Sequence, residues 1–413
     1  MKSKKKIVSI ISTTLFATAS VGLIVGFSVD WKMPKWIYIS GSSTVQPLIN
    51  EISKIYSAAE IISEAGGSST GIYNVVNYNK DVGATSREPL VHEAGLPEVG
   101  NEKAVTGEYS TAWSDLGVKT ITIGYDGIGL IYRFANSNQY NDLVVSQQNI
   151  LDIYAAFTGL NNEISSLKQI QSDLPDIQIR PYARTGGSNT SGTAEAFLNN
   201  SGFSLPEPGD PNYERWEKIE NVLNSGNYGA SVQQTAESNL ITWSNIKANS
   251  SNNNFAYMTY LSAGFIKNNY QDIIDSGFKV ALYQDEISNT PIPLINDSNE
   301  LNVPNKYKWY RPLDLIVRLK GIDNEEQISE IKSFIEWLYK NTIDEPNKNL
   351  INKYNNLGYV PLDKEKWATM SLDDKLDYTD ENGMGNNFWT SDYEIYQNQH
   401  IKRKQEKKFY GAR

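Results

Sequence analysis

The stretch that decides the fold is residues 36–56, which read WIYISGSSTVQPLINEISKIY. It opens with a short apolar and aromatic run, as a buried strand does. A Gly-Ser-Ser-Thr turn follows at 41–44, and apolar residues then recur at helical spacing from Val45 to Tyr56. The segment therefore predicts a strand, a hydroxyl-rich turn and a helix, in that order.

The same unit occurs twice more along the chain. Apolar residues 61–62 lead into GGSSTG at 66–71, and an alternating strand pattern at 177–182 leads into RTGGSNTSGT at 184–193. A helical pattern follows each loop. Strands that alternate with helices indicate an α/β fold. We also expect helices at 150–157 and 328–339, and strands at 120–124, 128–132, 255–258, 280–283 and 313–319.

Each of these loops places hydroxyls and flexible backbone at the start of a helix. A helix N-terminus has unpaired N–H donors and a partial positive charge, so it suits a tetrahedral anion. In open α/β sheets such loops gather at the carboxyl ends of the strands, where they can converge on one ligand. The alternative is that these Ser and Thr residues are ordinary helix caps.

Composition excludes several kinds of chemistry. The 413 residues suffice for two or three domains of roughly 150 residues each, and they include no cysteine. Disulfides, thiolate sites, cysteine nucleophiles and an acylated cysteine are therefore ruled out within this sequence. The histidines are His92 and His400, too few for a zinc site, and no P-loop motif is present. We therefore expect that the protein is not an enzyme and that it binds neither a metal nor a cofactor.

Charge is spread unevenly. The two ends, 1–35 and 401–413, hold 12 of the 38 Lys and Arg but 2 of the 48 Asp and Glu, which leaves residues 36–400 at a net charge of -20. Such an acidic body argues against nucleic acid as a partner, because phosphate backbones require a basic surface. It does not argue against one small anion in a pocket, where single arginines and local dipoles decide.

The N-terminus has an apolar run after a cluster of lysines, and the C-terminus has a basic tail. Four lysines precede the uncharged run 7–29, whose 23 residues can span a bilayer core. We expect a membrane anchor with the body on the outer face; the alternative is a signal peptide cleaved after Ala17-Thr18-Ala19. The basic tail IKRKQEKK at 401–408 is expected to be a solvated tail, or else a contact to an anionic surface.

Seven motifs, taken in order over residues 36–362, resemble the phosphate-binding proteins that serve bacterial phosphate ABC transporters. Each motif alone is weak, and their order is specific. They are ISGSSTVQPL at 39–48, AGGSSTG at 65–71, VGATSR at 82–87, GIGL at 127–130, ILDIY to FTG at 150–159, SGT with Phe197 at 191–197, and LGYVPL at 357–362.

This resemblance implies a fold, a ligand and a set of contacts. The fold would be two-lobed and of the periplasmic-binding-protein type, each lobe a mixed sheet flanked by helices, joined by two crossing strands. Phosphate would lie between the lobes, and an ABC transporter permease would be the partner of a monomeric receptor. The residues that the family motifs assign to phosphate are Ser43, Thr44, Ser68, Ser69, Ser86, Arg87, Arg184, Ser191, Gly192 and Thr193.

Two features depart from the family pattern. Arg87 stands where well-studied members have an Asp that accepts a hydrogen bond from protonated phosphate, so selectivity over sulfate is open. Arg184 lies seven residues before Ser191, whereas the family spacing is four; Ser188 has that spacing. Phe197 favours the alignment with Ser191, which would require a bulged loop.

The expected domains follow from the motifs. They are a signal or anchor segment (1–35), a discontinuous first lobe (36–124 and 300–375), a second lobe (125–299) and a C-terminal extension (376–413). The leading hypothesis is a membrane-anchored, extracytoplasmic phosphate receptor. The alternatives are a receptor for sulfate, molybdate or another oxyanion, and a surface adhesin or sensor that reuses the fold.

Overall fold

The computed structural model describes residues 35–362 except 88, 90–92, 94, 96–112, 190, 237, 286–289, 304–305 and 323. The expected anchor run 7–29, both histidines and the basic tail lie outside the described residues. None of the helices in the described part of the chain is long and apolar enough to cross a bilayer.

The strands form one large mixed sheet and a small two-stranded one. The main order is β2-β1-β3-β11-β4-β8-β6-β7, β9 and β12 pair with β4, and β5 pairs with β10. The bounds are β1 Trp36–Gly41, β2 Glu60–Ala65, β3 Val82–Thr85, β4 Val118–Arg133, β5 Val144–Ser146, β6 Gln178–Arg184, β7 Gln233–Thr235, β8 Phe255–Ser262, β9 Lys279–Val280, β10 Leu282–Gln284, β11 Tyr310–Arg318 and β12 Val360–Pro361.

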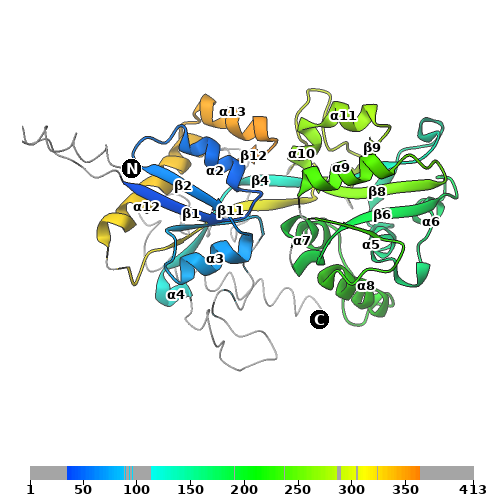
Figure 1. Ribbon diagram of the computed structural model, residues 1–413, viewed down its shortest axis with the longest axis horizontal. Coiled ribbons are helices and arrows are strands. Elements are labelled where there is room, and N and C mark those ends of the chain that lie inside the picture. The colour runs from blue at the N-terminus through cyan, green and yellow to red at the C-terminus, as the bar shows by residue number, and fades with distance from the viewer. Residues whose placement is uncertain are drawn as a thin grey trace, which may run out of the picture. The chain divides into compact units, whose positions relative to one another are not determined.

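Strand β4 joins two lobes. Its residues 118–127 pair with β11, and its residues 128–133 pair with β8. The first lobe is therefore built on β1, β2, β3, β11 and the first part of β4, and the second on β6, β7, β8 and the rest of β4 (Figure 1). This arrangement confirms the α/β class and the two-lobed fold. The lobe boundaries given above stay a prediction.

One expectation about β4 is wrong. Two strands, 120–124 and 128–132, were expected on either side of Tyr125-Asp126-Gly127, but 118–133 is one continuous strand of 16 residues. The reason is tertiary: Asp126 lies directly opposite Arg311 in the β4–β11 ladder. Its carboxylate pairs with that guanidinium, so the Asp-Gly pair does not open a turn there.

The helices flank the sheet of each lobe. Their bounds are α2 Gln46–Ser53, α3 Ser68–Val76, α4 Trp113–Leu116, α5 Ile150–Thr158, α6 Leu167–Ile170, α7 Gly192–Asn199, α8 Tyr213–Ser225, α9 Asn239–Asn249, α10 Ala263–Asn268, α11 Tyr270–Asp275, α12 Glu325–Tyr339 and α13 Lys348–Leu357. Helices α2 and α3 cover opposite faces of the first lobe's sheet (Figure 1), and their apolar residues accordingly belong to two separate core clusters.

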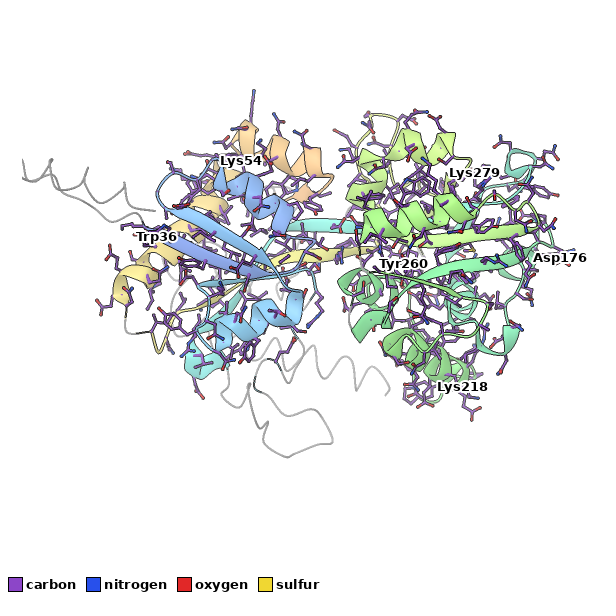
Figure 2. All side chains as sticks on the ribbon, viewed as in Figure 1. Trp36, Lys54, Asp176, Lys218, Tyr260 and Lys279 are labelled. Atoms are coloured by element: carbon purple, nitrogen blue, oxygen red, sulfur yellow. The ribbon has the colours of Figure 1, made fainter. Side chains whose placement is uncertain are left out.

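An aromatic stack ties the crossing segment to the second lobe. Phe197 of α7 stacks on Tyr260 of β8 with ring centroids 4.0 Å apart, and on Trp309 at 5.2 Å. The Trp309 indole N–H also donates to the carbonyl of Ala196 at 3.2 Å. Tyr260 lies inside the second lobe (Figure 2). Because Trp309 directly precedes β11, this stack fixes where α7 begins relative to the strands that cross between the lobes.

Candidate functional site

The first-lobe loops meet at three serines. The Ser42 hydroxyl donates to the Ser86 hydroxyl at 2.9 Å, and the Ser68 hydroxyl accepts from the Ser86 N–H at 3.2 Å. Ser42 and Ser86 are buried, whereas Ser68 is half-buried. The three loops therefore converge, as their places after β1, β2 and β3 predict. Ser42 was not among the expected site residues, although it lies in the same motif as Ser43.

Helix α3 reaches this point because of a glycine. A Cβ at Gly71 would lie 2.7 Å from the Ser40 carbonyl oxygen, 2.8 Å from that of Ala84 and 2.9 Å from the Cα of Gly41. All three are backbone atoms of β1 and β3, which cannot easily move. Glycine thus allows α3 to lie directly against these strands, with Ser68 and Ser69 at its first turn.

Arg311 is the central residue, and the motif analysis missed it. Its side chain is fully buried, and its Nε and Nη2 donate to Asp126 at 3.1 and 2.8 Å. Nη2 also donates to the hydroxyls of Thr44 at 3.2 Å and Thr193 at 3.3 Å. Arg311 therefore connects the loop before α2 in one lobe with the first turn of α7 in the other.

The third guanidinium nitrogen of Arg311, Nη1, makes none of these hydrogen bonds. Among the described residues, Nη1 is buried and has no hydrogen-bond partner. It lies near Gly192, because a Cβ at Gly192 would be 3.4 Å from Nη1 and 3.0 Å from the Ser86 hydroxyl. A buried guanidinium N–H normally has an acceptor, so this position, between the two lobes, is suited to an anionic oxygen.

The electrostatics of the pair depend on burial. Burial raises the pKa of the Asp126 carboxyl, while the Arg311 guanidinium and the Ser262 hydroxyl act in the opposite direction. The Ser262 hydroxyl donates to Asp126 at 3.1 Å. Asp126 is thus already bonded on both oxygens, which fixes the orientation of Arg311.

Helix α7 brings the expected second-lobe loop to the same place. Ser191 is its N-cap and accepts from the Ala194 N–H at 3.3 Å. Gly192 and Thr193 begin the helix beside Arg311. Ser188, the competing residue of the motif alignment, instead bonds to Asn224 of α8. The extra residues form a 3₁₀ turn at Gly187–Asn189, which supports the alignment with Ser191.

Arg87 is occupied. Its guanidinium makes two hydrogen bonds to Glu93, at 2.9 and 2.7 Å, and a third to the Ser69 hydroxyl at 2.8 Å. Both Arg87 and Glu93 are buried. The charge that the motif analysis counted toward the anion is therefore balanced by a carboxylate, and Ser69 supports Arg87.

Arg184 makes hydrogen bonds to α9 and to the segment that precedes it. It donates to the Ala236 carbonyl at 3.0 Å, to the Asn239 side-chain oxygen at 2.7 Å and to the Thr242 hydroxyl. The Asn239 oxygen also accepts from the Ser262 N–H at 3.2 Å. Arg184 thereby fixes the amide of Asn239 at the N-terminus of α9.

A cavity of about 390 Å³ opens beside Arg311. It is lined by both lobes, with Ser43, Thr44 and Tyr359 from the first and Thr193, Asn239 and Leu240 from the second. Thr44 is fixed from two sides, because the Tyr359 hydroxyl donates to its carbonyl at 2.6 Å. Burial raises the pKa of Tyr359, so this hydroxyl keeps its proton.

Four of the ten expected residues thus gather around Arg311: Thr44, Ser86, Gly192 and Thr193. Ser43 lines the cavity, while Ser68, Ser69 and Ser191 hold the loops in place. Arg87 and Arg184 contact the same loops with other partners. Within the described residues, no group of three or more acidic or histidine side chains could hold a metal ion.

Comparison with known proteins agrees with this architecture. The model of a family described as the PBP superfamily domain matches residues 20–342. The chain belongs to the PBP superfamily. The family expected from the motifs is confirmed at this level. One protein of similar sequence is an uncharacterized lipoprotein of Mycoplasma genitalium. It is 32% identical over 368 residues, which cover 86% of this chain and 89% of the relative.

Solved structures are similar to this PBP-superfamily chain as well. An ABC-type phosphate transport receptor from Vibrio cholerae has 16% identity and a TM-score of 0.47, covering 79% of this chain and all of that one. PstS from Borrelia burgdorferi has 16% identity and a TM-score of 0.46, covering 80% of this chain and 99% of that one.

Proposed function

We propose that this PBP-superfamily protein is an extracytoplasmic receptor that binds inorganic phosphate between its lobes and delivers it to an ABC transporter permease. It binds without turnover. The observation that carries the proposal is the buried Nη1 of Arg311, which has no hydrogen-bond partner among the described residues. The motif resemblance and the superfamily membership support it.

The donors around this nitrogen fit a tetrahedral anion. Arg311 offers Nη1, the Ser86 hydroxyl of the first lobe lies beside it, and α7 of the second lobe begins next to both at Gly192. Each such donor favours negative charge, and helix N-termini do so through their dipoles as well. A ligand bonded to Ser86 of the first lobe and to the N-terminus of α7 in the second holds the lobes together, and closure around the ligand is how such receptors signal to a partner.

Anchoring can differ from that of the Mycoplasma relative. That protein is named a lipoprotein, but the present sequence has no cysteine to acylate. We propose that the apolar run 7–29 anchors the receptor, with the lobes on the outer face of the membrane. A signal peptide cleaved from the same run is the alternative.

Titration calorimetry on the purified full chain in detergent tests the proposal. Phosphate, sulfate and molybdate are each added at pH 7. Saturable phosphate binding that exceeds sulfate binding by tenfold or more is expected. Equal binding of sulfate would assign a general oxyanion receptor instead, and no binding of any anion would favour the adhesin or sensor alternative.

Phosphate should bind more tightly at pH 8 than at pH 6, by several-fold. The carboxylate that contacts Arg311, Asp126, is already bonded on both oxygens, to Arg311 and to Ser262, so it is not placed to accept a hydrogen bond from protonated phosphate. Hydrogen-bond donors therefore dominate the proposed site. They favour the phosphate dianion over the monoanion, and the dianion is the main form at pH 8. Sulfate keeps its charge over this range and should show a flat profile. Tighter phosphate binding at pH 6 would contradict this assignment.

Gly192→Ala should weaken phosphate binding about tenfold, which is about 1.4 kcal/mol. The new methyl group would lie 3.0 Å from the Ser86 hydroxyl and 3.4 Å from Arg311 Nη1, where the anion is proposed to bind. Alanine is a better helix former than glycine, so thermal stability should not fall. Asn199→Ala, at the exposed far end of α7, is the control, and calorimetry compares the two.

A further inference from the structure

The cavity beside Arg311 is larger than inorganic phosphate requires. At about 30 Å³ per water in the liquid, its roughly 390 Å³ would hold about thirteen waters. A tetrahedral oxyanion has four oxygens around one central atom and would leave most of that volume unfilled. The volume also falls within the range of about 300–1,000 Å³ found for small-molecule sites.

The cavity adjoins the Arg311 guanidinium through two threonines. Thr44 and Thr193 line it, and both accept hydrogen bonds from Nη2 of Arg311, which is joined to the same guanidinium carbon as Nη1. A phosphate group placed at Nη1 of Arg311 can therefore point one oxygen toward the cavity. A substituent on that oxygen would then extend into the cavity.

The lining suggests which substituent would fit. None of the described residues that line the cavity is charged; amides and hydroxyls alternate with apolar side chains such as Leu240 and Phe265. Asn239 is positioned for recognition. Its oxygen is held by Arg184 and by the Ser262 N–H, so its NH₂ group, which has no partner among the described residues, is free to donate to a ligand hydroxyl.

The rim has an exposed apolar residue that such a ligand would cover. Leu240 lines the cavity, yet it is 62% exposed. An organic group of a few carbons would contact it, whereas a lone oxyanion at Arg311 would not.

We propose that the same site takes the phosphate group of a small, otherwise uncharged phosphate monoester, such as a polyol phosphate, with the organic part in this cavity. The inference rests on the proposed function, because the phosphate group uses the same contacts to Arg311, Ser86 and α7. It adds a ligand class and assigns Asn239 and Leu240 to specificity.

Calorimetry on the full chain in detergent, with inorganic phosphate and with glycerol 3-phosphate, tests this inference. The variant is Leu240→Trp, which places an indole at the cavity rim. The matched control is Ile241→Trp, since Ile241 is the next residue, is 46% exposed and does not line the cavity. Both positions are exposed, so neither variant disturbs the core.

The ester is expected to bind at least tenfold more tightly than inorganic phosphate. Leu240→Trp should remove that advantage while changing phosphate affinity less than twofold, and Ile241→Trp should change neither. Binding of phosphate without the ester, or ester binding that Leu240→Trp leaves intact, would overturn the inference and leave the proposed function standing. Failure of both ligands to bind would overturn the proposed function, and this inference with it.

Discussion

Arg311→Met should abolish phosphate binding and lower the free energy of unfolding by about 3–5 kcal/mol. Removing one partner of a buried ion pair leaves the other as an uncompensated buried charge, and a loss of this size is typical. Here both Arg311 and Asp126 have fully buried side chains. Urea unfolding measures the stability, and calorimetry measures the binding.

A second variant separates the two effects. In Arg311→Met combined with Asp126→Asn, the charge that would be left unpaired is removed, and the amide oxygen can still accept from Ser262 and from the Gly264 N–H, as the carboxylate does. Most of the lost stability should return, and phosphate binding should not. A double variant that binds phosphate as the wild type does would show that Arg311 is a structural residue and not a ligand.

Gly71→Ala should destabilise the protein by about 1–3 kcal/mol, the usual cost of adding a methyl group to a tightly packed site. The added Cβ would lie within 3.0 Å of three backbone atoms of β1 and β3, so α3 must move away from the sheet. That movement displaces Ser68 and Ser69, and phosphate affinity should fall together with the melting temperature.

Gly66→Ala in the same loop is the matched control. Its Cβ would meet the side chain of Thr70 at 3.0 Å and no backbone atom. Both residues are exposed, so Thr70 can rotate away and little stability should be lost. If both alanine variants lost the same stability, the close approach of α3 to β1 and β3 would not be the cause.

The strand-loop-helix units could be predicted because each is local. The pattern at 36–56 corresponds to β1 and α2, and the patterns at 61–76 and 177–198 correspond to β2 with α3 and β6 with α7. Periodicity within one segment suffices for such elements. The convergence of the loops after β1 and β2 followed from the general rule that loops gather at the carboxyl ends of strands, whereas the loop after β3 was indicated only by the family motif at 82–87.

Arg311 could not be found in this way, because its role depends on strand register. Its partner Asp126 is 185 residues away in sequence, and the two meet only when β11 pairs with β4. The strand was expected to begin at 313, which left Arg311 outside it. A weak signal existed: Arg311 lies two residues before the expected buried strand 313–319, and a charged residue needs a partner if it is buried. The break expected between 124 and 128 is absent for a similar reason, because these residues of β4 pair with β11.

The position of β11 has a consequence for synthesis of the chain. This strand lies between β3 and β4 in the sheet, yet it begins only at Tyr310, after every strand of the second lobe has been made. Ribosomes add about 5–20 residues per second, so roughly ten to fifty seconds separate β3 from β11. During that interval β3 and β4 both present unpaired edges, and such edges pair readily with other segments. On each nascent chain, β11 must therefore displace whatever has paired there first.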